Sequence, residues 1–328
     1  SLSELELGPA EVDVGIIAAA FLFDDKGQTI EDFVRNSVED LIGKKGSILE
    51  VAQDVVLYGF GRIGRLLTRM LIEDSGGGDN LRLRAIVVRK AVEDDLIKRA
   101  NLMRTDSVHG PFKGTVRVIE DEDKLIINGN EIKIIYANSP SDIDYTKYGI
   151  DKALLIDNTG VWRDKAGLGT HLNCKGISKV LLTAPAKDGI KNIVHGINNN
   201  IMENDELLGA ASCTTNAIVP TLKVLNDEFD IQSGHIESVH SYTNDQNLID
   251  NFHKKVRRGR SAALNMVITE TGAGKAVGQV LPELKGKLTA NAVRVPTPNV
   301  SLAIINLRFA KDITLSLIHI SEPTRRSY

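Results

Sequence analysis

The sequence predicts an α/β protein with two domains: a parallel-sheet domain at 53–211, followed at 212–314 by an α+β domain with a mixed sheet. Within 53–211, short apolar runs alternate with amphipathic segments, an order typical of parallel strands covered by helices. Beyond Cys213 the apolar runs become longer, which favours a mixed sheet. A length of 328 residues is sufficient for two domains with separate cores.

Residues 1–52 are predicted to form a helical extension ahead of the first domain. Thr29 and Asp32 have the spacing of a capping box, and apolar residues between Ile30 and Ile42 recur at helical spacing. Glycines 43 and 46 are expected to end this helix. One amphipathic helix is therefore expected in the extension.

The elements of the two domains follow from the same patterns. In the first domain, strands are expected at 55–58, 81–88, 115–119, 124–127, 131–136, 153–156, 180–182 and 207–210, and helices at 62–73 and 94–103. Asn128-Gly129-Asn130 is typical of a tight hairpin turn. In the second domain we expect a helix that begins at Cys213 and ends at Phe229, then strands at 235–242, 293–297 and 300–309.

Composition excludes several classes of protein. The longest apolar run, 14–23, is shorter than the roughly 18 residues that a membrane-spanning helix needs, and acidic rather than basic residues precede it. A net charge of −3 suggests no nucleic-acid or membrane partner. The two cysteines provide no disulfide framework. We expect a cytoplasmic protein and no metal site.

The run Gly59-Phe60-Gly61-Arg62-Ile63-Gly64 fits the pattern G-x-G-x-x-G. It directly follows a predicted strand and opens a predicted helix, which is the context of a Rossmann-type dinucleotide site. The first glycine permits the tight turn, the second lets the backbone approach a pyrophosphate, and the third allows the helix to pack closely on the strand. The pyrophosphate would then lie at the helix N-terminus.

The residues after the second strand leave the choice of dinucleotide open. An acidic residue there would hold the ribose hydroxyls of NAD, but this chain has Arg89 and Lys90, and the nearest acids come later, at 93–95. A cationic pair can accept the 2′-phosphate of NADP. Two solvated charges at a strand end would look the same in sequence. The cofactor is therefore predicted as NAD or NADP.

A cysteine is predicted at the start of a helix in the stretch 211–216, Ala-Ser-Cys-Thr-Thr-Asn. The positive end of the helix dipole and free N–H groups would stabilise the Cys213 thiolate. His240 ends a second apolar strand, and we expect this strand to lie parallel and adjacent to 207–210, so that the crossover helix brings the two side chains together. A thiol beside a base is the arrangement that nucleophilic cysteine catalysis requires.

This stretch, together with His240 in 239–246, resembles the catalytic core of phosphorylating glyceraldehyde-3-phosphate dehydrogenase. The loop 59–65 has that family's form, and the similarity extends from about residue 55 to about 307. Residues 1–52 resemble the end of the N-terminal extension of longer bacterial members. A homotetramer is implied by the same resemblance.

The resemblance also implies a reaction and the residues that perform it. Glyceraldehyde 3-phosphate would be oxidised to 1,3-bisphosphoglycerate, with Cys213 as the nucleophile that forms a thioester and His240 as the base. Arg294 would bind phosphate groups at two sites. The other residues implied are Thr243 and Asp245 for the substrate phosphate, Ser212, Thr214, Arg260, Thr271 and Gly272 for inorganic phosphate, and Thr159, Gly160 and Thr183 for the cofactor.

Two other functions are compatible with the sequence. An erythrose-4-phosphate dehydrogenase would share the fold but prefer water to phosphate as the acyl acceptor. The basic run 254–260 would suit a catalytically inactive module that binds a dinucleotide or RNA.

The chain departs from the family pattern in three places. Family members continue well beyond residue 309, so we expect a truncated catalytic domain followed by an atypical tail at 315–328. Ile268 and Glu270 replace residues that are small or hydroxylated in the family. The carboxylate of Glu270, next to Thr271, would weaken phosphate binding by like-charge repulsion.

Overall fold

The computed structural model describes residues 5, 12, 14–23, 27–39, 42, 52–75 and 80–311. The chain forms two compact units: a first unit that ends at Asn192 and takes in 201–210, and a second unit made of 193–200 and the chain from Ala211 onward. The predicted tail at 315–328 and the glycines 43 and 46 lie outside the described residues. The predicted domain boundaries, at 52/53, 211/212 and 314/315, stay predictions.

The first unit is built on a nine-stranded sheet of order β10-β11-β9-β8-β1-β2-β7-β6-β5. Neighbouring strands from β10 to β7 are parallel, and β6 and β5 add an antiparallel hairpin at one edge. The strands are β1 (Gln53–Tyr58), β2 (Leu81–Val88), β5 (Val116–Ile119), β6 (Lys124–Ile127), β7 (Asn130–Tyr136), β8 (Ala153–Asp157), β9 (Ile177–Leu182), β10 (Lys191–Asn192) and β11 (Leu207–Gly209). A separate two-stranded pair is formed by β3 (Thr105–Asp106) and β4 (Gly110–Pro111).

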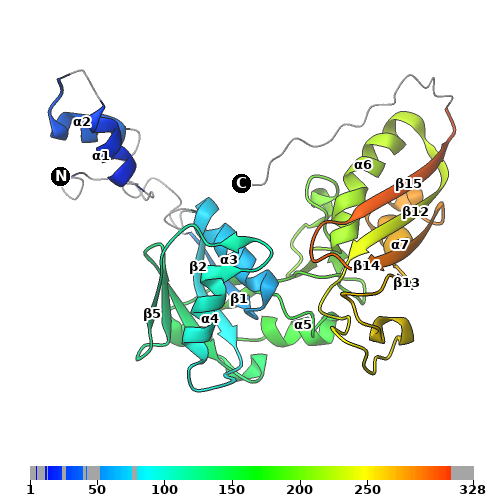
Figure 1. Ribbon diagram of the computed structural model, residues 1–328, viewed down its shortest axis with the longest axis horizontal. Helices are drawn as coiled ribbons and strands as arrows, with labels where there is room; N and C mark the ends of the chain where they lie inside the picture. The colour runs from blue at the N-terminus through cyan, green and yellow to red at the C-terminus, as the bar shows by residue number, and fades with distance from the viewer. Residues whose placement is uncertain are drawn as a thin grey trace. The chain divides into compact units, whose positions relative to one another are not determined.

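Helices cover both faces of this sheet, as the alternation along β1 shows. Val55 and Leu57 point into a core shared with α3 (Arg62–Ser75) and α4 (Asp95–Arg104), whereas Val56 and Tyr58 point into a core shared with α5 (Lys165–Leu172). Figure 1 labels these three helices on the ribbon. Successive strand residues face opposite sides of a sheet, so a strand buried on both faces reads as a continuous apolar run. The predicted α/β class is confirmed.

The described part of the extension contains two helices, α1 (Val14–Leu22) and α2 (Ile30–Ser37). Thr29 caps α2, because its side chain accepts a hydrogen bond from the Asp32 N–H at 3.1 Å. The Asp32 carboxylate accepts from the Thr29 hydroxyl (2.8 Å), and no bond from the Thr29 backbone N–H is seen, so half of the predicted capping box is present. Sequence reasoning missed α1 as a helix. Within the described residues, no helix has the length and apolar character needed to cross a membrane.

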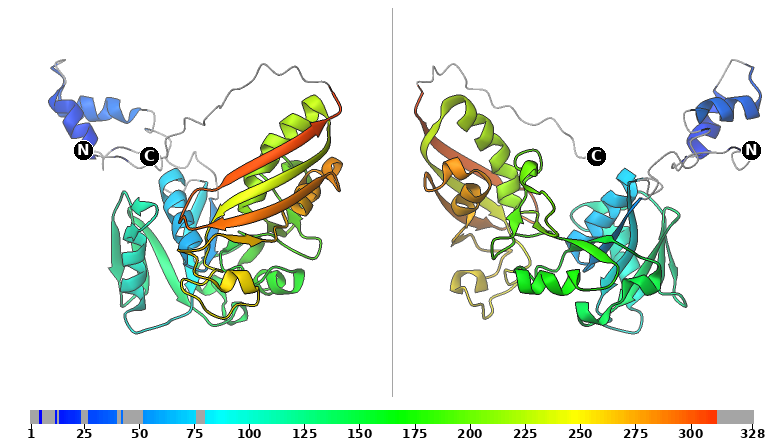
Figure 2. Two further views of the ribbon diagram at one scale, coloured as in Figure 1. Left: turned by 45° about the vertical axis from the view of Figure 1, so that its right-hand side comes forward. Right: turned by 180° about the vertical axis from the view of Figure 1, so that it is seen from behind.

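The second unit contains a four-stranded mixed sheet of order β13-β14-β12-β15. Its strands are β12 (Ile231–Ser241), β13 (Val267–Thr269), β14 (Leu288–Val295) and β15 (Leu302–Phe309). Only the central pair, β12 and β14, is parallel. The helices α6 (Cys213–Phe229) and α7 (Ala273–Val280) lie on one face of this sheet (Figure 2). Their apolar side chains form a core with β12 and β14. The predicted mixed sheet is confirmed.

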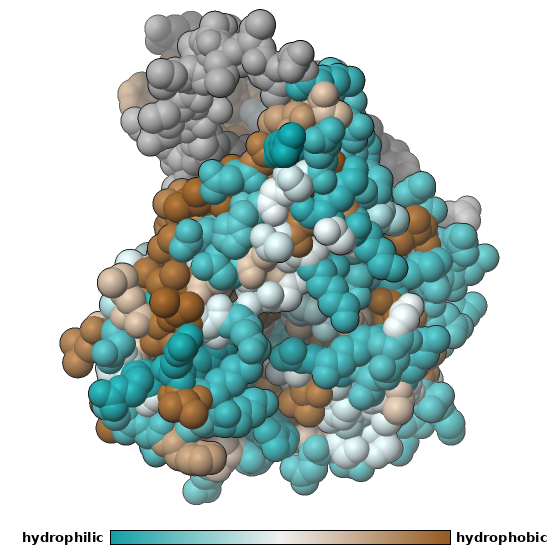
Figure 3. Space-filling view, turned by 90° about the vertical axis from the view of Figure 1, so that its right-hand side faces the viewer, coloured by the Kyte–Doolittle hydropathy of each residue, from teal (hydrophilic) through white to brown (hydrophobic). Residues whose placement is uncertain are grey.

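The other face of this sheet has no helix packed on it among the described residues. Leu302 and Ile304 of β15 are exposed there, and Val300 just before the strand is 79 % exposed. The loops of the second unit add further exposed apolar side chains: Leu248, Ile249, Phe252, Val256, Leu264 and Met266. Figure 3 views the chain from the right-hand side of Figure 1 and shows patches of apolar surface between polar residues.

One prediction about the sheets is wrong. The strand at 207–210 was expected to lie beside the strand that carries His240, but β11 belongs to the nine-stranded sheet and β12 to the four-stranded sheet. Both edges of β11 are already occupied, by β9 and β10, so no edge is left for β12. The chain leaves the first sheet after Gly209 and turns at Ala211, whose φ is +58°.

Candidate active site

Cys213 is the first residue of α6, as the sequence predicts. Ser212 caps this helix, because its hydroxyl oxygen accepts a hydrogen bond from the Thr215 N–H at 3.0 Å. The Cys213 thiol is free and exposed at the positive end of a helix of 17 residues. A thiolate at this position is stabilised by the helix dipole.

His240 reaches the cysteine from β12. Its Nε2 lies 3.5 Å from Sγ of Cys213, and its Nδ1 lies 2.6 Å from the carbonyl oxygen of Ser241. A carbonyl can only accept, so Nδ1 carries the hydrogen and the neutral ring presents Nε2 as a base toward the thiol. The side chains of Cys213 and His240 therefore meet, although β11, the strand that precedes α6, and β12 belong to different sheets.

The pKa values of this pair favour proton transfer near neutral pH. The hydrogen bond with His240 lowers the pKa of Cys213 from 9.0 to about 7, and the Thr214 hydroxyl and N–H contribute to the same shift. The hydrogen bond with Cys213 raises the pKa of His240, while the positive charge of Arg294 opposes that rise. A thiolate facing a protonated imidazole is the reactive state of a catalytic cysteine.

Arg294 stands beside His240 because the parallel register of β12 and β14 pairs these two residues. Its Nη1 donates to the Ser241 carbonyl and to the Thr243 hydroxyl, both at 3.1 Å, and lies 3.1 Å from His240 Nδ1. Burial lowers the pKa of Arg294. Its buried Nε has no hydrogen-bond partner within the described part of the chain, which leaves this donor available to a ligand.

A second guanidinium, which sequence reasoning missed, completes the cluster. Arg258 forms an ion pair with Asp245, and its Nε donates to the Thr269 hydroxyl at 3.1 Å. Burial raises the pKa of Asp245, but the Thr243 hydroxyl and the two arginines outweigh this effect and hold the pKa below its usual value. Two cations around one carboxylate leave a net positive charge, which suits a phosphate.

The side chains predicted to bind inorganic phosphate have different partners in the structure. The Ser212 hydroxyl is engaged in capping α6, and Thr271 accepts from the Ala273 N–H at 3.2 Å where Gly272 precedes α7. Arg260 instead pairs with Asp250 at 2.7 Å and its side chain is 64 % exposed. The roles of these residues stay predictions.

The first unit contains a cavity of about 690 Å³ at the glycine-rich loop. Of the residues predicted for the cofactor, five line it: Gly59, Phe60, Gly61, Arg89 and Thr159. The others, Arg62, Ile63, Gly64, Gly160 and Thr183, are not part of its lining. Their roles also stay predictions.

The glycines of this loop fit a bound pyrophosphate. Gly59 has a φ of +97°, which favours glycine, and a Cβ on Gly64 would lie 2.2 Å from the Gly59 carbonyl oxygen, so only glycine allows this close approach. A Cβ on Gly61 would meet nothing within 4 Å. The loop therefore leaves open space at the second glycine, where a pyrophosphate must approach the backbone.

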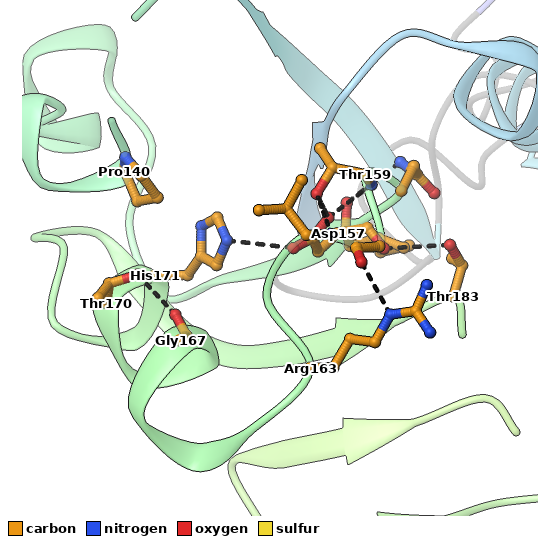
Figure 4. Close-up of polar contacts among 12 residues, drawn as sticks. Pro140, Asp157, Thr159, Arg163, Gly167, Thr170, His171 and Thr183 are labelled. Carbon is orange, nitrogen blue, oxygen red and sulfur yellow. Dashed lines mark hydrogen bonds and ion pairs between the residues drawn. The ribbon is translucent and has the colours of Figure 1, made fainter. Parts of the chain in front are cut away.

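A buried carboxylate supports the adjacent strand ends, and sequence reasoning missed it too. The Asp157 carboxylate accepts hydrogen bonds from the N–H and the hydroxyl of Thr159 at 2.6 and 2.7 Å (Figure 4). The backbone carbonyl oxygen of Asp157 accepts a hydrogen bond from the Thr183 hydroxyl at 3.1 Å. It also lies 3.3 Å from His171, and both side chains are fully buried. Asp157 thus holds Thr159 and Thr183 in place.

Comparison with known proteins assigns both units to one family. Residues 53–165 match the model described as glyceraldehyde 3-phosphate dehydrogenase, NAD binding domain, and residues 212–321 match the model described as the C-terminal domain of the same enzyme. The chain belongs to the glyceraldehyde-3-phosphate dehydrogenase family. It is 62 % identical to a glyceraldehyde-3-phosphate dehydrogenase-like protein of Pseudomonas aeruginosa, over 96 % of this chain and 68 % of that protein.

More distant members of the family also match. The chain is 39 % identical to glyceraldehyde-3-phosphate dehydrogenase of Priestia megaterium, over 81 % of this chain and 76 % of the relative. It is 39 % identical to chloroplastic glyceraldehyde-3-phosphate dehydrogenase A of Zea mays, over 90 % of this chain and 73 % of the relative. The chain is therefore an oxidoreductase of this family, and its cofactor is NAD or NADP.

Proposed function

We propose that this chain catalyses the phosphorylating oxidation of glyceraldehyde 3-phosphate to 1,3-bisphosphoglycerate, in glycolysis or gluconeogenesis. The observation that carries the proposal is the 3.5 Å contact between Cys213 Sγ and His240 Nε2, in a unit where Arg294 lies 3.1 Å from the same imidazole. A nucleophile, a base and a phosphate-binding cation are thus within reach of one small substrate.

The first step forms a carbon–sulfur bond. The Cys213 thiolate attacks the aldehyde carbon, and the carbonyl oxygen takes the proton that the protonated His240 holds at Nε2, which gives a thiohemiacetal and a neutral imidazole. His240 Nε2 then accepts the hydroxyl proton while the former aldehyde carbon is oxidised to a thioester. Bound NAD or NADP supplies the acceptor for the hydride lost in this step.

The second step breaks the carbon–sulfur bond. Inorganic phosphate attacks the thioester carbon, the acyl phosphate leaves, and sulfur departs as the thiolate that the helix N-terminus and His240 stabilise. We assign Arg294, Thr243 and Asp245 to the phosphate of the substrate. The attacking phosphate is assigned to Arg294 with Ser212, Thr214, Arg260, Thr271 and Gly272.

One observation favours an erythrose-4-phosphate dehydrogenase as the second candidate. Glu270 is adjacent to Thr271, its side chain is 93 % exposed, and the one cation that pairs with it among the described residues is Lys255, whose Nζ lies 3.7 Å away. An incompletely neutralised carboxylate at the site assigned to inorganic phosphate would favour water as the acyl acceptor.

An RNA-binding module is less well supported. Three cations of the basic run 254–260 are paired with carboxylates: Lys255 with Glu270, Arg258 with Asp245, and Arg260 with Asp250. Paired cations contribute little to binding of a nucleic-acid backbone, which requires free positive charge.

We further propose a cytoplasmic homotetramer, which would cover the exposed apolar side chains of the second unit.

Steady-state turnover tests the proposal. Reduction of NAD and of NADP is measured with glyceraldehyde 3-phosphate, with and without inorganic phosphate, on the wild type and on Cys213→Ser. Turnover that requires phosphate and disappears in Cys213→Ser supports the proposal. Phosphate-independent turnover, with erythrose 4-phosphate as the better substrate, favours the second candidate, and absence of turnover with a thiol of ordinary reactivity rejects both.

A further inference from the structure

The cavity of the first unit has a positively charged wall, formed by Arg89, Lys90 and Arg99. This wall lies where β2 ends and α4 begins, the position that faces the adenosine ribose in a Rossmann-type domain. Among the described residues that line the cavity, none is an aspartate or a glutamate. A site that prefers NAD places a carboxylate here to accept hydrogen bonds from the ribose.

Two of the three carboxylates that follow β2 are already engaged. Asp95 is buried, forms an ion pair with Arg99, and accepts a hydrogen bond from the Ala91 N–H at 3.1 Å. Asp94 pairs with Lys98 at 2.8 Å and is not part of the cavity lining. Neither of these two carboxylates is therefore free to bind ribose hydroxyls, and the third acid after β2, Glu93, is exposed and does not line the cavity.

The three cationic side chains of the wall differ in their interaction partners. Arg99 is neutralised by Asp95, and its Nη2 donates to the Arg89 carbonyl oxygen at 3.0 Å, which fixes the backbone of Arg89 from α4. The Lys90 ammonium lies 5.5 Å from the centre of the Tyr136 ring. The Arg89 side chain is exposed and forms no ion pair with a described carboxylate, so its planar fork is available to an anion.

We propose that this cavity selects NADP over NAD, with Arg89 as the residue that receives the 2′-phosphate of the adenosine ribose. The inference rests on the dehydrogenase function proposed above, but it concerns the cavity of the first unit alone. A 2′-phosphate adds a charge of about −1.5 to −2 at pH 7 and three acceptor oxygens, which a guanidinium can bind in bidentate fashion. The uncharged 2′-hydroxyl of NAD meets no carboxylate acceptor in this wall.

Binding can be measured without turnover, because the only tryptophan of the chain, Trp162, lines the cavity. The probes are ADP-ribose and its 2′-phosphorylated analogue, which lack the nicotinamide. Each is titrated into the full chain, followed by Trp162 fluorescence and by calorimetry. The variants are Arg89→Ala, Arg89→Asp and, as a matched control, Arg117→Ala, which removes an exposed arginine of β5 that does not line the cavity.

We expect the 2′-phosphate to lower the Kd at least tenfold in the wild type and in Arg117→Ala. Arg89→Ala should bring the ratio of the two Kd values close to one, and Arg89→Asp should reverse it. Equal or tighter binding of ADP-ribose by the wild type, or an unchanged ratio in Arg89→Ala, overturns the proposal. So does a wild type that binds neither probe.

The same titration on Cys213→Ser separates this inference from the proposed function. Cys213 lies in the second unit, so the variant should keep the tenfold preference while losing all turnover. A wild type that prefers the 2′-phosphorylated probe but does not oxidise glyceraldehyde 3-phosphate rejects the proposed function and supports the assignment of Arg89.

Discussion

At the scale of single residues, the chemistry that we propose depends on one proton shared by Cys213 and His240. Sγ and Nε2 are 3.5 Å apart, and each group shifts the pKa of the other in the direction that favours its charged form. Arg294 works against the charge on His240 but provides positive potential for an anionic substrate. The pKa shifts therefore favour a reactive thiolate on Cys213, while Arg294 limits the rise in the pKa of His240, so that His240 can still act as a base.

The pH dependence of alkylation tests this balance. Because the folded pKa of Cys213 is lowered to about 7, its thiolate should be present above pH 7 and lost as the pH falls through that value. The rate of reaction with iodoacetamide should rise with a midpoint near pH 7. In His240→Gln the main cause of the shift is removed, so the midpoint should move toward 9.

Cys174 provides the internal control for that measurement. Its thiol is buried, and burial raises its pKa, so it should contribute little to alkylation of the folded chain. Cys174→Ala should leave the profile unchanged. A wild-type midpoint near 9 would contradict the proposed role of His240.

Arg258 gives a second prediction at this scale. Its ion pair with Asp245 and its bond to Thr269 hold the group that we assign to the substrate phosphate. Arg258→Ala should raise KM for glyceraldehyde 3-phosphate about tenfold, equivalent to about 1.4 kcal/mol, with a smaller effect on kcat. Arg257→Ala is the control, because among the described residues the Arg257 side chain makes only a 3.4 Å hydrogen bond, to the Ile268 carbonyl oxygen. Equal effects of the two variants would exclude a specific role for Arg258.

At the scale of elements, the turn from β1 to α3 requires its glycines for different reasons. Gly64 permits contact between the helix and the Gly59 carbonyl, whereas Gly61 faces open space. Gly64→Ala should therefore destabilise the fold by about 1–3 kcal/mol, the usual cost of overpacking, and lower Tm. Gly61→Ala should keep the wild-type Tm but weaken binding of ADP-ribose at least tenfold, because its methyl group enters the space of the pyrophosphate. A normal Tm for Gly64→Ala would argue against the close contact.

Local sequence patterns predicted most of these elements, because burial imposes periodicity. The strand expected at 81–88 is β2, and the helix expected from Cys213 to Phe229 is α6. What the patterns could not supply is contact between distant segments. Nothing local in 254–260 distinguishes Arg258, which turns toward Asp245, from Arg260, which pairs with Asp250.

At the scale of the whole molecule, the same limit explains the wrong sheet assignment. The sequence around Gly209 reads as a strand and that around His240 as another, but only pairing partners decide which sheet each joins. The contact between Cys213 and His240 could still be predicted, because a resemblance to a family carries three-dimensional information that periodicity lacks. The support from Asp157 and His171 was not found, because a buried carboxylate after an apolar strand looks like any loop residue.

The exposed apolar side chains of the second unit predict that the chain forms oligomers. Val300, just before β15, and Leu302, on the face of β15 that no described helix covers, are 79 % and 59 % exposed, and burying such side chains gains roughly 25 cal/mol per Å² of apolar surface. We expect the full chain to sediment as an oligomer at micromolar concentration and Leu302→Lys to shift it to smaller species. Met70→Lys, an equally drastic change at an exposed site on α3, should leave sedimentation unchanged. A wild-type chain that sediments as a monomer would contradict the proposed tetramer while leaving the chemistry of Cys213 untouched, because Cys213, His240 and Arg294 all come from one chain.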